Sequence, residues 1–154
     1  MILMTQRLHR DRHDRGVRGP LFSSALPRYR SRRQRFDATV LEAYAPLQQR
    51  YAAQLTHLDI AVDTVPRMRL GFDPALVPDE VVADGPVPLG RVIPAGVDSS
   101  GRPTRARLVL FRMAIEQRVV SAQERRELVT TVLTALMANY LNISPTDIDP
   151  NFQW

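Results

Sequence analysis

The most constraining part of this sequence is a long amphipathic stretch near its C-terminus, residues 127–144. Apolar side chains recur there at every third or fourth position, which places them on one stripe of an α-helix. The stripe consists of Val129, Val132, Leu133, Leu136, Met137 and Tyr140. Burying side chains of this size contributes on the order of 1.5–3 kcal/mol each before entropy is counted. We therefore expect packing along this stripe to hold the helix in place.

The end of this helix is also marked in the sequence. Asn142 suits the left-handed position that closes a helix, and Ile143 supplies the apolar residue that usually follows it. Ser144, Pro145 and Asp147 then have the residue types of an N-cap, a first helical position and an acid in the first turn. The sequence thus predicts a short final helix directly after the long one.

Charge divides the chain at about residue 35. Residues 1–35 contain ten arginines against Asp11 and Asp14, a net charge of +8, whereas residues 36–154 contain eleven arginines and fourteen acids, a net charge of −3. The first part also lacks apolar periodicity, so it cannot bury enough surface to offset the entropy lost on ordering. We predict a mostly disordered, arginine-rich arm over 1–35 and one folded domain over 36–154.

The folded part is expected to begin with a helix. Its apolar residues recur at helical spacing from Phe36 onward, and Asp37 is a plausible N-cap. Pro46 lies inside this pattern, where it lacks a donor and clashes with the preceding turn. We therefore predict a kink or a break near Ala45.

Three strands are expected between the two long helices. Residues 57–65 alternate between apolar and polar, which is typical of a half-buried strand. Residues 88–93 and 106–112 predict two more strands, the second covered on both faces, with residues 96–103 joining them. Proline-rich residues 66–87 predict a long irregular loop. The order of elements indicates a small α+β domain with a sheet of about three strands, a long C-terminal helix and a short final helix.

Composition excludes several classes of chemistry. The chain has no cysteine, so it contains neither a disulfide nor a thiolate metal site. It has no P-loop, dinucleotide-binding glycine motif or G-x-S-x-G nucleophile motif. No run of 18 apolar residues is present, so we expect a cytoplasmic protein without a membrane span. Every basic residue is arginine, and with abundant Ala, Val and Pro this indicates GC-rich coding of a bacterial kind.

Residues 36–150 resemble the small bacterial zincin-like metallopeptidase family, which has a minimal metalloprotease fold. The likeness consists of the order and spacing of segments and covers roughly three-quarters of the chain. After the early helix, the matching segments are LDIAVDTV (58–65), PLGRVIP (88–94), ARLVLFRMAIEQ (106–117), ERRELV (124–129) and YLNIS (140–144). The resemblance implies a zincin-like α+β fold for residues 36–154.

In that family the last helix carries His-Glu-x-x-His: two imidazoles one turn apart hold zinc, and the glutamate activates the bound water. Aligning the helix ends places this pentad on Ala135-Leu136-Met137-Ala138-Asn139. Alanine has no donor atom, leucine cannot act as a base, asparagine is a poor zinc ligand, and residues 127–154 contain no histidine. The resemblance therefore implies a degenerate member without zinc, catalytically inactive, that acts as a binding or regulatory module for an unknown protein or peptide.

Two other functions stay open. The arm could bind nucleic acid or another anionic partner weakly and without sequence specificity, because neutralising phosphates needs only clustered cations. The candidate arginines for this role are Arg28, Arg30, Arg32, Arg33 and Arg35. An active metallopeptidase would need unconventional ligands from the three scattered histidines, His9, His13 and His57.

The sequence also leaves open what surrounds the degenerate motif. The face that contains Ala135 and Asn139 is small and weakly polar, and it is either packed shut or retained as a cleft. Phe152 and Trp154, near the end of the chain, are expected to fold back onto the domain.

Overall fold

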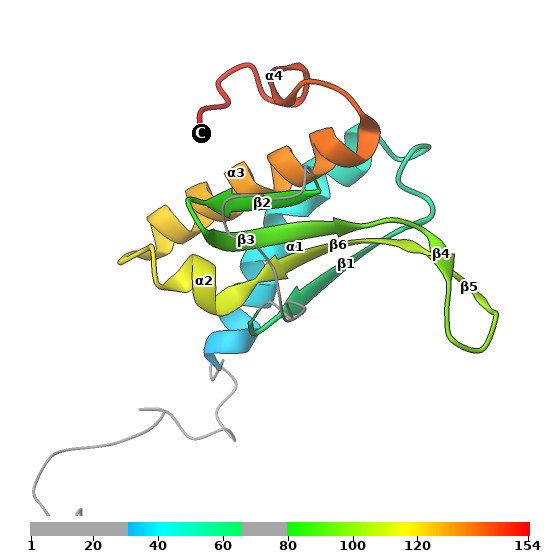
Figure 1. The fold of residues 1–154 in the computed structure, drawn as a ribbon. Helices are drawn as coiled ribbons and strands as arrows, with labels where there is room; N and C mark the ends of the chain where they lie inside the picture. The colour runs from blue at the N-terminus through cyan, green and yellow to red at the C-terminus, as the bar shows by residue number, and fades with distance from the viewer. Residues whose placement is uncertain (1–30, 66–79) are drawn as a thin grey trace, which may run out of the picture.

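A computed structural model describes residues 31–65 and 80–154, and these form one α+β unit (Figure 1). Its elements, in chain order, are α1 (Arg32–Arg50), β1 (Leu58–Asp63), β2 (Val81–Asp84), β3 (Val87–Ile93), β4 (Gly96–Val97), β5 (Pro103–Thr104), β6 (Ala106–Phe111), α2 (Arg112–Glu116), α3 (Ala122–Leu141) and α4 (Pro145–Ile148). The predicted α+β class is thereby confirmed, as are the long C-terminal helix and the short helix after it.

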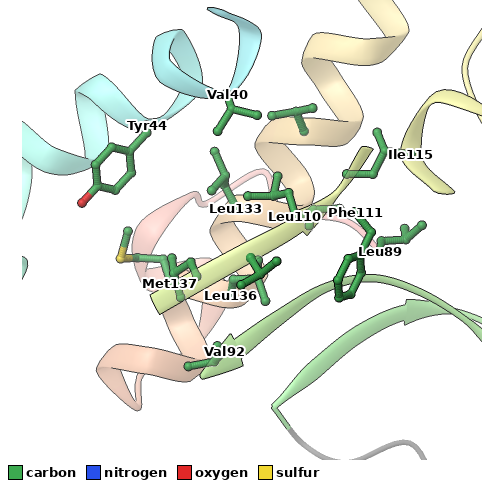
Figure 2. Packing of buried hydrophobic residues seen from close by; sticks show 14 of the residues in the cluster. Val40, Tyr44, Leu89, Val92, Leu110, Phe111, Ile115, Leu133, Leu136 and Met137 are labelled. Atoms are coloured by element: carbon green, nitrogen blue, oxygen red, sulfur yellow. The ribbon is translucent and has the colours of Figure 1, made fainter. Parts of the chain in front are cut away.

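Four strands form the main sheet in the order β1-β6-β3-β2. The β1 and β6 strands run parallel, while β3 is antiparallel to both of its neighbours. The β4 and β5 strands form a separate small ribbon that projects from the sheet (Figure 1). Helix α3 packs on β2, β3 and β6, and α1 packs on α3. The stripe of α3 therefore forms the centre of the core (Figure 2).

The first helix begins earlier than the sequence predicted. Its N-cap is Ser31, whose hydroxyl accepts from the amide of Gln34 while the Gln34 side chain accepts from the Ser31 amide. This reciprocal capping box satisfies two amides that the first turn would otherwise leave unpaired. The expected N-cap at Asp37 is wrong, and residues 31–35 belong to the domain, not to an arm. Residues 1–30, the rest of the predicted arm, lie outside the described residues.

The same helix continues past its internal proline. Pro46 lies within α1, which ends only at Arg50, so of the predicted kink or break near Ala45 the break does not occur. Phe36, Val40 and Tyr44 form the buried side of the helix and attach it to α3. This packing offsets the hydrogen bond that the proline removes.

The three predicted strands are confirmed, and the structure adds β2 to the main sheet and the β4–β5 ribbon in the segment predicted to join the last two strands. The β1, β3 and β6 strands lie where the sequence placed them, and Leu108 to Phe111 of β6 are all buried. The predicted irregular loop over 66–87 is wrong at its end, because β2 forms a hairpin with β3. Its turn contains Gly85, which has a φ of 58°. Residues 66–79 lie outside the described residues. Helix α2, only five residues long, was not predicted.

The end of the long helix follows the prediction closely. Asn142 has φ 57° and ψ 45°, the left-handed conformation, and the Ile143 amide donates to the Ala138 carbonyl at 3.0 Å. Pro145 occupies the first turn of α4, and the Ser144 amide donates to the Asp147 carboxylate. These contacts turn the chain back, so that α4 packs on α3.

Candidate functional site

The three positions aligned with the zinc motif do not share one environment. Leu136 is completely buried, Ala135 is half-buried, and Asn139 is exposed. Ala135 and Asn139 are four residues apart and lie on one side of α3, whereas Leu136 lies about 100° around the helix, on the side that faces the core. The position that would hold the catalytic carboxylate is therefore part of a packed wall, while the two ligand positions lie at its rim.

Leu136 is held by a close approach between helix and sheet. A methyl group built on Gly90 of β3 would lie 2.8 Å from Cδ1 of Leu136 and 3.0 Å from the carbonyl oxygen of Val109. A Cβ atom essentially never approaches another heavy atom this closely in a protein. Only a glycine at position 90 therefore leaves this space to the leucine side chain. The leucine thus occupies the space between α3 and the middle of the sheet (Figure 2).

A cleft lies beside the same helix, toward its N-terminus. It has a volume of about 560 Å³ and is open to solvent. It is lined by residues from the β2–β3 hairpin, the α2–α3 connection, α3 and the C-terminal segment: Asp84, Leu89, Arg118, Val119, Glu124, Glu127, Leu128, Thr131, Gln153 and Trp154. Ala135 and Asn139 follow Thr131 by four and eight residues, so these two positions share the side of α3 on which the cleft lies, although neither lines it, whereas Leu136 faces the core. The structure thus has a packed wall at Leu136 and a cleft one turn before Ala135.

The charges of the cleft are mostly negative. Arg118 is the one cation among the described residues that line it, and its Nε donates to the Asp84 carboxylate at 2.7 Å while its Nη1 donates to the Ala114 carbonyl. The Glu124 carboxylate accepts from the Val120 amide at 2.8 Å, and Glu127 accepts from a neighbouring glutamine amide. Neither glutamate forms an ion pair with any residue in the described part of the chain. The cleft therefore presents two carboxylates without a countercharge there.

The C-terminal segment completes the cleft. Gln153 and Trp154 line it, and Phe152 is half-buried. The expected return of the C-terminal aromatics onto the domain is thus confirmed, although the Trp154 side chain remains 61% exposed. Sequence reasoning did not single out Asp84 or Arg118, because they are 34 residues apart and only the hairpin brings them together.

Near the C-terminal end of α3, a tyrosine hydroxyl lies in buried surroundings. Tyr44 of α1 lies near Tyr140 of α3 and Asp59 of β1. Burial, and to a lesser degree these two neighbours, raises the pKa of the Tyr44 hydroxyl above its usual value. At neutral pH this group is therefore neutral and contributes no charge to the site.

The remaining candidates are dispersed. His57 is exposed just before β1, and His9 and His13 lie outside the described residues. Among residues 31–65 and 80–154, no three His, Asp or Glu side chains are grouped as metal ligands. Arg32, Arg33 and Arg35 are exposed on the first turn of α1, whereas Arg28 and Arg30 lie outside the described residues.

No protein-family model matches the chain, and no curated protein matches it. The likeness to the zincin-like family thus stays an expectation from the sequence. Within the described ranges, none of the helices has the length and apolar character needed to traverse a lipid bilayer.

Proposed function

We propose that the domain is a zinc-free, non-catalytic relative of the zincin-like metallopeptidases that binds a protein or peptide segment in the cleft beside α3. One observation carries the proposal: the cleft adjoins the degenerate motif on one side of α3, and Leu136 of that motif is a core residue. Ala135 and Leu136 have no metal-binding atom and Asn139 is a poor zinc ligand, so this set does not fit zinc. A cleft that retains polar and aromatic groups is suited to holding a chain without cutting it.

The zinc content and peptidase activity of the purified full-length protein test the catalytic half of this proposal. We expect no stoichiometric zinc by elemental analysis, no cleavage of a mixed peptide library, and the same unfolding temperature with and without a chelator. The reason is that stability comes from packing and not from a metal. Stoichiometric zinc together with chelator-sensitive cleavage would overturn it.

The binding half needs a change inside the cleft. Thr131→Arg places a bulky side chain in it, and Thr130→Arg adds the same group to an exposed neighbour that does not line it. In an affinity selection from a random peptide library, we expect peptides that bind the natural protein to lose affinity at least about tenfold with the first variant only, which is ~1.4 kcal/mol. Equal loss with both variants, or none with either, would contradict binding in the cleft.

A second candidate function is weak, non-specific binding of nucleic acid by Arg28, Arg30, Arg32, Arg33 and Arg35. The supporting observation is the placement of Arg32, Arg33 and Arg35 at the start of α1, exposed and with no acidic residue in the first turn. Positive charges are unfavourable at a helix N-terminus, because that end carries the positive end of the helix dipole. These arginines therefore do not stabilise α1, and a binding role is one reason for their presence.

The salt dependence of binding tests this second candidate. If Arg32 and Arg33 each contact a phosphate, changing both to glutamine is expected to reduce the slope of log K against log salt by about 2 on duplex DNA. Changing the exposed Arg102 and Arg107 to glutamine alters net charge equally and is expected to leave the slope unchanged. Equal slopes for the two double variants would contradict a nucleic-acid role for α1.

A further inference from the structure

The cleft has the chemistry of a site for basic side chains. Of the charged residues that the structure describes in its lining, the cation Arg118 is already paired with Asp84, which leaves Glu124 and Glu127, one turn apart on α3, as the available charges. Trp154 adds an indole face at the same cleft. A guanidinium group can contact a carboxylate and stack on an indole at once, and the stacking alone contributes on the order of 0.5–1 kcal/mol at an exposed site.

The chain itself contains a segment with the complementary charge. Residues 1–30 contain seven arginines against Asp11 and Asp14, a net charge of +5, and five of these arginines lie within residues 7–18. The described structure begins at the N-cap Ser31. Residues 19–30 alone span up to about 40 Å when extended at ~3.3 Å per residue, so residues 7–18 can reach most of a domain of this size.

We propose that residues 7–18 dock in the cleft of the same molecule, with arginine side chains against Glu124, Glu127 and Trp154. This inference rests on the proposed function, because it makes the arm an intramolecular competitor of the peptide that the cleft takes. Tethering favours such a contact, since linking two binding groups in one chain raises their effective concentration, to about the millimolar range for short tethers. Binding of an external partner would then require displacement of the arm, and salt would weaken the docked state.

Trp154 is the only tryptophan of the chain, so its fluorescence reports on the cleft alone. The experiment compares the full-length protein, free of nucleic acid, with a variant in which Arg7, Arg10, Arg12, Arg15 and Arg18 are changed to serine. Acrylamide is the quencher because it is neutral, so the arm's charge does not alter its local concentration. We expect the Stern–Volmer constant of the natural chain to be about half that of the variant at low salt. The difference should vanish near 1 M NaCl, where the Debye length is ~3 Å.

Two further double variants form a test and its control. Changing Glu124 and Glu127 to glutamine keeps their acceptor oxygens and removes the charge, and it is expected to remove the protection of Trp154 from quenching. Changing Glu42 and Asp63, which are exposed outside the cleft, to glutamine and asparagine should leave the protection intact.

Equal quenching of the natural chain and the five-serine variant at low salt would overturn the inference. Protection that grows with protein concentration would also overturn it, because the arm would then occupy the cleft of another copy. Neither of these two outcomes decides the proposed function. The proposed function fails separately if the variant with serine at positions 7, 10, 12, 15 and 18 binds no peptide, or if zinc-dependent cleavage is found.

Discussion

Replacing Leu136 with glutamate, the residue that the proposed resemblance to the zincin motif would place here, is expected to lower the free energy of unfolding by roughly 3–5 kcal/mol or more. The leucine is completely buried, and its Cδ1 lies where a side chain on Gly90 would otherwise be. The substitution removes this apolar packing and places a carboxylate in the same space. A charged group there has lost its water, and no described cation lies in the core cluster to compensate it.

Urea denaturation followed by circular dichroism measures this effect, and Leu136→Met is its matched control. Methionine has nearly the same volume, so it is expected to cost less than about 1.5 kcal/mol. The deficit of the glutamate variant should be smaller at pH 4 than at pH 7. Burial raises the pKa of the introduced carboxyl, so the folded state tolerates the protonated form and loses stability as pH rises through the unfolded value. A glutamate variant as stable as the natural protein would mean that position 136 faces the cleft.

This result would bear on function as well as stability. If a single glutamate is not tolerated, introducing histidines at Ala135 and Asn139 still leaves no position for a general base at 136 without repacking the contact with β3. The packing of the core would then exclude a zincin-type motif here, whatever side chains stand at 135 and 139. A protein of this kind is expected to function through binding surfaces, for which the cleft beside Thr131 and Trp154 is the candidate.

Replacing Phe36 with alanine is expected to destabilise the domain by about 3–5 kcal/mol. Phe36 is completely buried although it lies only five residues after the N-cap Ser31, and its helix packs along α3. Removing the ring leaves a cavity that rigid neighbours on α3 cannot close. A large effect would show that α1 is part of the core from its first turns onward.

Leu41→Ala is the control for this experiment, since Leu41 lies on the same helix with a side chain that is 63% exposed. It is expected to change stability by less than about 0.5 kcal/mol in the same denaturation measurement. Equal effects of the two substitutions would indicate that α1 does not pack on α3 as described. An unfolding midpoint unaffected by either would assign the helix to the arm after all.

The elements that could be predicted are those whose signal lies within a few neighbouring residues. Three features of this kind were predicted: the apolar stripe of α3, the left-handed Asn142 and the proline at the start of α4. Each is encoded by residue types within three or four positions of one another, so each can be recognised in the sequence. The errors occurred where a local signal competed with distant packing. Pro46 would end an isolated helix, but α1 is held against α3 by Phe36 and Val40. The β2 strand lies among prolines and acids and exists because β3 offers it hydrogen-bonding partners.

The candidate site divides in the same way. The residue types at positions 135, 136 and 139 are visible in the chain before it folds, so the sequence by itself determined that a His-Glu-x-x-His motif is absent from this long helix. Only the tertiary structure decided what surrounds these positions. Gly90 admits Leu136 into the core, and the β2–β3 hairpin together with the returning C-terminus places Asp84 and Trp154 beside α3. These contacts join residues far apart in the chain, and their energies depend on distances that no local pattern encodes.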